Sequence, residues 1–258
     1  MPAVFIGHGS PMNTLARNRY TDAWRTLGEA MPRPAAILAV SAHWYVRGTA
    51  VTAMGTPRTI HDFGGFPQAL FDFRYPAPGS PALAQRVREV LAPLVVGADE
   101  NWGLDHGTWS VLAHLYPGAD IPVVQLSMDA TGSPAFHYDL GKRLAPLRDE
   151  GVLVVGSGNV VHNLGVLNWS ADAQPFDWAA RFDDVVRDHV SRGDHPPLVD
   201  FATFGADARM SIPTPEHYLP LLYILGMQGA GEPAAIAVDG IQNASISMLS
   251  VVIGGIRT

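Results

Sequence analysis

Five of the ten histidines stand where a fold can bring their side chains into one crevice. His8, His43 and His162 each follow an apolar run typical of a buried strand, while His106 and His217 each open a helical pattern. Ligands of open α/β sheets bind just beyond the carboxyl ends of the strands. A single histidine is more often a satisfied core or surface residue. Because imidazole binds iron, zinc, copper and nickel, five such residues together indicate a metal site.

Two carboxylates lie beside these candidate ligands. Glu216 directly precedes His217 and is either a metal ligand, as in the triad of two histidines and a carboxylate of non-haem iron oxygenases, or a partner of the helix dipole. Asp105 precedes His106 and either orients that imidazole from behind or is a solvated loop residue.

The segment before His162 contains two glycines and a serine. Gly156 and Gly158 allow either a close approach of the backbone to a ligand or a plain tight turn. The segment is not a dinucleotide fingerprint, because the third glycine and the downstream acidic residue are missing. Neither Ser10 nor Ser157 lies in a Gly-x-Ser-x-Gly elbow, which argues against a serine nucleophile.

Apolar runs alternate with helical patterns and must position these residues. The run Ala35 to Trp44 begins with eight small or apolar residues, which is typical of a strand covered on both faces. Further strands are predicted at 3–6, 46–54 (an edge strand), 121–128, 151–155, 234–238 and 244–253. Helices are predicted at 13–31, 80–94, from the 103–109 segment to 116, at 133–148, at 177–192 and from 214 to 227. This alternation predicts an α/β fold with a mainly parallel central sheet between helix layers, to which the later strands add antiparallel pairs.

Residues 59–79 form a long loop rich in aromatic residues. A loop of this length is usually functional or disordered, and its aromatic content argues against disorder. We expect either a lid over an aromatic ring or a hydrophobic cluster under a long loop. The aromatic residues are Phe63, Phe66, Phe71, Phe73 and Tyr75.

Composition limits the classes of function. The 258 residues, 47% of them hydrophobic, suit one catalytic domain over 1–258. A net charge of −7 argues against nucleic acid as a partner. Without cysteine, a metal must be held by imidazole and oxygen ligands. We find no signal peptide and no apolar run of the roughly 18 residues that cross a membrane, and therefore expect a soluble cytoplasmic protein without a membrane partner.

Five short segments together resemble the class III extradiol ring-cleavage dioxygenases. The resemblance is closest to the DOPA 4,5-extradiol branch, which occurs in bacteria and in plant pigment synthesis. The segments follow the family's order with similar spacing, which is specific for the family and not for a substrate. They are 7–12 (GHGSPM), 41–44 (SAHW), 105–109 (DHGTW), 156–163 (GSGNVVHN) and 214–221 (TPEHYLPL).

The resemblance implies a divalent metal, Fe(II) in the active enzyme, which purified protein can carry as Zn(II). It implies His8, His43 and His217 as metal ligands. It further implies His162 as a fourth ligand or as the acid/base, and His106 as a proton donor or substrate contact. The implied reaction opens the ring of a DOPA-like catechol with O2 to give a muconic semialdehyde.

Two other functions are compatible with these residues. A zinc hydrolase can be built on three histidines and an open position, with Glu216 or His162 as its base. A non-enzymatic binding protein of the same superfamily would tolerate loss of the ligand histidines, whereas this chain retains all of them. The wider superfamily uses two histidines and a glutamate, so His217 beside Glu216 departs from its pattern.

Overall fold

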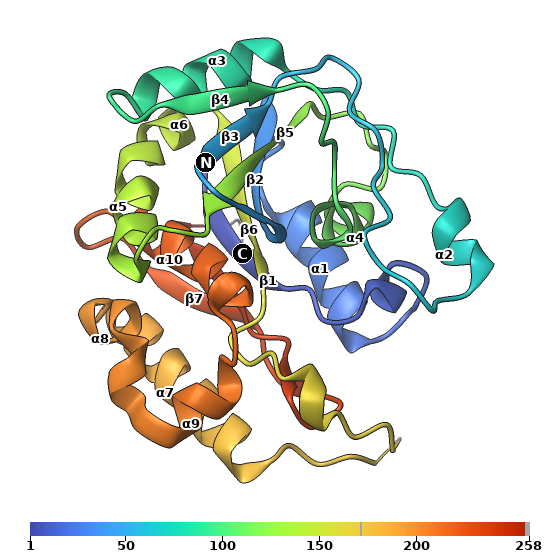
Figure 1. The fold of residues 1–258 in the computed structure, drawn as a ribbon, viewed down its shortest axis with the longest axis vertical. Coiled ribbons are helices and arrows are strands. Elements are labelled where there is room, and N and C mark those ends of the chain that lie inside the picture. The colour runs from blue at the N-terminus through green and yellow to red at the C-terminus, as the bar shows by residue number, and fades with distance from the viewer. Residues whose placement is uncertain (171, 256–258) are drawn as a thin grey trace.

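A computed structural model describes residues 1–170 and 172–255 (Figure 1). Its strands are β1 (Ala3–Gly7), β2 (Ala36–Val46), β3 (Thr49–Thr52), β4 (Val96–Asp99), β5 (Val123–Asp129), β6 (Val152–Gly158), β7 (Ala234–Val238), β8 (Ile241–Gln242), β9 (Ile246–Ser247) and β10 (Ser250–Ile253). Eight of them form one sheet in the order β4-β3-β5-β2-β6-β1-β10-β7, and β8 pairs with β9 in a separate hairpin.

The centre of the sheet is parallel and its margins are mixed. β5, β2, β6 and β1 run parallel to one another. Antiparallel pairs follow on both sides, β10 with β1 and β7 on one, β3 with β5 on the other. The prediction of an α/β fold with a mainly parallel sheet and later antiparallel strands is confirmed.

The central strands are buried on both faces, as the apolar run in 35–44 predicted. In β2, Leu38 and Val40 join the core on one face of the sheet and Ile37 joins the core on the other. The same alternation occurs in β6, where Val154 and Val155 point to opposite cores. This two-sided burial fixes where each central strand ends, and with it the position of any residue that follows.

Helices cover both faces (Figure 1). The α-helices are α1 (Arg19–Ala30), α2 (Gln68–Asp72), α3 (Pro81–Val90), α4 (His106–Leu115), α5 (Pro134–Leu144), α6 (Pro146–Asp149), α7 (Asp177–Arg192), α8 (Pro196–Val199), α9 (Gly205–Ser211) and α10 (Leu219–Gly226). Short 3-10 helices are η1 (Pro11–Thr14), η2 (Leu164–Val166), η3 (Phe201–Phe204) and η4 (Pro215–His217). α1 packs on α4 over one face, and α10 packs on α5 and β6 over the other. In the described part of the chain no helix is both long and apolar enough to cross a bilayer.

Several predicted boundaries were wrong. The predicted edge strand at 46–54 is the end of β2 followed by β3, which lies between β5 and the unpredicted edge strand β4. The helix predicted from residue 13 begins at Arg19, because the Asn18 side chain caps it by accepting hydrogen bonds from the Tyr20 and Thr21 amides. The predicted strand at 244–253 is divided into β9 and β10, and the helices between 196 and 211 were not predicted.

Candidate active site

The strand order brings the strand-end histidines together. β2, β6 and β1 are neighbours, so the chain leaves all three at the same edge of the sheet. His8 follows β1 directly, and His162 lies just beyond β6. His43 lies inside the last part of β2, which is longer than predicted, where the register with β5 shifts between Val40 and Tyr45.

His217 reaches this edge on η4, which packs against the end of β6. The Asn159 amide donates to the His217 carbonyl oxygen at 2.8 Å. A Cβ on Gly158 would collide with that oxygen, and one on Gly156 would lie 2.7 Å from the Pro220 oxygen. The two glycines therefore serve a close approach of backbone to backbone, which places His217 beside the sheet.

Three of the histidines offer ring nitrogens to one small space. The ligand atoms of His8, His43 and His217 all lie within 4.8 Å of one another. Nε2 of His8 and Nε2 of His43 are 3.4 Å apart. Two nitrogens bound about 2.1 Å from one tetrahedral metal are about 3.4 Å apart. The spacing and the all-imidazole donor set thus fit a divalent transition metal.

The hydrogen bond of His8 Nδ1, the ring nitrogen that points away from the other histidines, fixes the protonation of this ring. The Ser157 hydroxyl donates its hydrogen to the Gly107 carbonyl oxygen at 2.6 Å. Its oxygen, 3.0 Å from His8 Nδ1, must therefore accept the Nδ1 hydrogen. Nε2 of His8 is left with a free lone pair, which is the state that a metal requires.

Carboxylates pair with the outer nitrogens of the other two histidines. Asp62 Oδ2 lies 3.3 Å from His43 Nδ1. Glu216 Oε1 is hydrogen-bonded to His217 Nδ1 at 3.1 Å. Glu216 thus stands behind the His217 ring, a position that the sequence alternatives of ligand and helix-dipole partner did not include.

Burial keeps these imidazoles neutral. It lowers the pKa of His8 and of His217 well below the ordinary value, with the neighbouring histidines adding to the effect. Burial and the nearby His106 lower the pKa of His43 to about 3. A neutral imidazole is the form that binds metal, so the electrostatics of the pocket favour ligation at physiological pH.

His162 and His106 flank the group of three. The His162 ring lies flat against that of His217, with centroids 3.4 Å apart and an interplanar angle of 7°. Burial lowers the pKa of His162 to about 4. The His106 ring lies 3.8 Å from that of His43, and its Nδ1 is 2.9 Å from Asp62 Oδ2. All five predicted histidines therefore meet in one place.

Sequence reasoning missed Asp62 and misjudged Asp105. Asp105 is fully buried and caps α4, accepting hydrogen bonds from the Ser41 hydroxyl at 2.7 Å, the Thr108 amide at 3.1 Å and the Gln125 side chain. Burial raises the pKa of this carboxyl. Asp105 is thus no solvated loop residue, and the carboxylate beside the His106 imidazole is Asp62 instead.

A pocket of about 410 Å³ opens over the histidines. Phe63 and Phe66 from the aromatic loop line one side, and the Phe63 ring is 5.4 Å from that of His106. The aromatic loop therefore contributes a pocket wall, and it also forms the alternative hydrophobic cluster through Phe71 and Trp109. Apolar side chains from the segment after His162, which the sequence did not single out, line another part of the wall: Leu164, Leu167 and Trp169.

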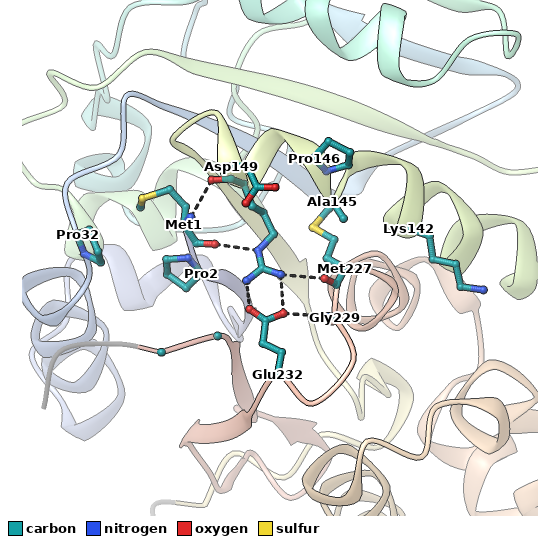
Figure 2. Close-up of a pocket in the computed structure, with 13 residues that line it drawn as sticks. Met1, Pro2, Pro32, Lys142, Ala145, Pro146, Asp149, Met227, Gly229 and Glu232 are labelled. Carbon is teal, nitrogen blue, oxygen red and sulfur yellow. Dashed lines mark hydrogen bonds and ion pairs between the residues drawn. The ribbon is translucent and has the colours of Figure 1, made fainter.

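A second hollow of about 690 Å³ lies at the other end of the parallel strands (Figure 2). Its main charged pair is Arg148 with Glu232. The Arg148 guanidinium is already used by Glu232 and by the carbonyl oxygens of Met1 and Met227, each at 2.8 Å. The Arg148 guanidinium is thus occupied by contacts that hold the chain together. The histidine pocket is therefore the better candidate for chemistry.

Comparison with known proteins agrees with this geometry. The chain is 57% identical over 258 residues to a 4,5-DOPA dioxygenase extradiol of Escherichia coli strain K12, covering 98% of this chain and 95% of that one. It is 38% identical over 240 residues to the enzyme of that name from Beta vulgaris, covering 90% and 88% of the two chains. A crystal structure of an uncharacterized protein from Escherichia coli K12 matches with a TM-score of 0.87 and 51% identity, over 98% of this chain and 100% of that one.

A family model supplies the remaining comparison. Residues 4–254 match the model described as the catalytic LigB subunit of aromatic ring-opening dioxygenase. That range includes all five histidines, both helix layers and the whole sheet except Ala3. This chain therefore belongs to the LigB family of aromatic ring-opening dioxygenases.

Proposed function

We propose that the histidine pocket cleaves the ring of a DOPA-like catechol beside its two hydroxyl groups, with O2 and Fe(II), to give a muconic semialdehyde. The observation that carries the proposal is the convergence of His8, His43 and His217 on one space beneath an apolar pocket. The names of the relatives support DOPA or a close analogue as the substrate. Family membership favours ring opening over the zinc hydrolase and the binding protein.

In this proposal His8, His43 and His217 hold the metal. When bound, Fe(II) would supply a Lewis acid for the catechol oxygens and a path by which electrons pass from the catecholate to O2. His162 is either a fourth, movable ligand or the acid/base. The ligand atoms of His162, Glu216 and His217 also lie within 4.8 Å of one another, but His162 does not share a group with His8 and His43. We favour the acid/base role for this reason.

The remaining side chains have proposed roles in binding and proton transfer. Burial lowers the pKa of His162 to about 4, so its ring is neutral at physiological pH and has a nitrogen lone pair free to accept a hydrogen bond from a catechol hydroxyl. In this proposal the pKa of that hydroxyl would be lowered by a bound metal, so that its proton could pass to His162. His106 contacts the substrate or donates a proton on the opposite side of the pocket. Phe63 and Phe66 pack against the aromatic ring and exclude water.

Oxygen uptake tests the proposal directly. Protein reconstituted with Fe(II) is given a panel of catechols that includes DOPA, and O2 consumption is measured together with the yellow ring-opened product. We expect uptake matched by product with the Fe(II) protein and none with the same protein carrying Zn(II). Absence of uptake across the panel, with iron shown to be bound, would refute ring cleavage and favour hydrolysis or a binding role.

A further inference from the structure

We propose that Asp62 is a positioning residue that fixes which ring nitrogen of both His43 and His106 carries the hydrogen. The inference uses the proposed function only in taking His43 as a metal ligand. Asp62 Oδ2 lies 3.3 Å from His43 Nδ1 and 2.9 Å from His106 Nδ1. Its other oxygen, Oδ1, accepts the backbone amide of His106 at 2.9 Å.

One carboxylate oxygen faces two imidazole nitrogens. An ionised carboxylate only accepts hydrogen bonds, so each nitrogen that faces it is stabilised with its hydrogen on Nδ1. A neutral imidazole has a single N–H, so with the hydrogen on Nδ1 the other nitrogen, Nε2, has a free lone pair. For His43 this is the nitrogen that faces Nε2 of His8 at 3.4 Å. We assign Asp62 the same role toward His43, across a contact of 3.3 Å, that the Ser157 hydrogen bond has toward His8.

The contact with His106 depends on the orientation of its ring. The buried Nδ1 makes no straight hydrogen bond in the described structure, although Asp62 Oδ2 is within hydrogen-bond distance. A hydrogen bond at this distance therefore requires the imidazole to turn until Nδ1–H points at the carboxylate. The His106 and His43 rings are in contact at 3.8 Å between centroids, so a rotation of one ring shifts its neighbour.

Asp62 also connects the aromatic loop to these rings. Its side chain is 17% exposed, and the next residue, Phe63, contacts the His106 ring. The loop that forms the pocket wall therefore delivers the carboxylate as well. The position of the aromatic loop therefore determines, through Asp62, which hydrogen-bond acceptor faces the Nδ1 atoms of His43 and His106.

The substitution Asp62→Asn separates the two uses of the carboxylate. Asparagine has the same size and keeps an oxygen for the His106 backbone amide, so the loop retains its anchor. Its amide nitrogen is a donor and cannot accept a hydrogen from Nδ1. Asp72→Asn is the matched control, since Asp72 belongs to the same region and accepts only an exposed hydrogen bond from Gln68 at 2.9 Å.

The first readout is the ¹⁵N spectrum of the histidine rings in metal-free protein, which reports the protonated nitrogen of each ring. We expect His43 and His106 to carry hydrogen on Nδ1 in the wild type and in Asp72→Asn, and to shift toward Nε2 in Asp62→Asn. The second readout is Co(II) affinity, expected to fall about 10- to 100-fold in Asp62→Asn alone.

Two results would overturn the assignment. One is a wild-type spectrum with both rings protonated on Nε2, which is informative whether or not the variant folds. The other is a folded Asp62→Asn protein whose ring states and Co(II) affinity match the control. Both expectations can be met while the Fe(II)-loaded wild type turns over no catechol. That result would refute the proposed function and leave the role of Asp62 intact.

Discussion

Removing the hydroxyl behind His8 should weaken metal binding without removing a ligand. Ser157 Oγ is the acceptor for His8 Nδ1 and a donor to the Gly107 oxygen, and both Ser157 and His8 are buried. Ser157→Ala leaves the Nδ1 hydrogen unpaired, at a cost of about 1–3 kcal/mol. The ring can avoid this cost by moving its hydrogen to Nε2, where it competes with the metal. We therefore expect metal affinity to fall about 10- to 100-fold.

Competition with a chelator measures this change for Co(II) and Zn(II). Ser110→Ala is the control, because Ser110 is an equally buried serine whose hydroxyl has no partner among the described residues. We expect the control to bind as the wild type does. Equal affinities of Ser157→Ala and the control would refute the claim that the outer hydrogen bond sets the state of His8.

Four further substitutions test other parts of the molecule. His43→Ala should abolish metal binding with little loss of fold, whereas His106→Ala should keep the metal and slow turnover; full metal occupancy in His43→Ala would contradict the ligand assignment. Burial raises the pKa of Asp183 to about 6, above the unfolded value of 3.8. The wild type therefore loses stability as the pH rises between these values. Relative to wild type, the free energy of unfolding of Asp183→Asn should rise by about 2 kcal/mol between about pH 4 and pH 7.5 in urea titrations. Arg148→Met leaves Glu232 without its cation and should lower the free energy of unfolding by about 3 kcal/mol in the same titrations.

The histidine cluster could be predicted from the sequence because local apolar runs show where the strands end, and the strand ends determine which residues meet. A two-sided apolar run can form only a central strand, and neighbouring parallel strands end at one edge. His8, His43 and His162 therefore converge once β1, β2 and β6 are neighbours. The two alternatives for Gly156 and Gly158, an approach of the backbone to a ligand or a tight turn, were wrong, because both glycines lie in β6 and are approached by the backbone of residues 217–220.

The sequence did not indicate the groups behind the histidines. Asp62 lies in a long loop without periodicity, and its partners come from β2 and α4. Asp105 is adjacent to His106 in sequence, yet as the residue that caps α4 its side chain turns to Ser41 and Gln125. The edge strand β4 was missed because it is short and half of it is exposed, so that no apolar run marks it. Such contacts depend on the packing of distant segments, which local patterns do not encode.

The position of Glu216 offers an explanation for the ligand set of this chain, which has three histidines where the wider superfamily has two histidines and a glutamate. With His8, His43 and His217 as proposed ligands, all three direct donors are neutral, and they leave the charge of a divalent metal uncompensated. Asp62 and Glu216 each contact the outer nitrogen of one of these rings, so two negative charges lie one imidazole away from the metal. A carboxylate in that position raises the basicity of the imidazole in front of it. We therefore propose that the Glu216 carboxylate acts on the metal through His217 and not by direct ligation.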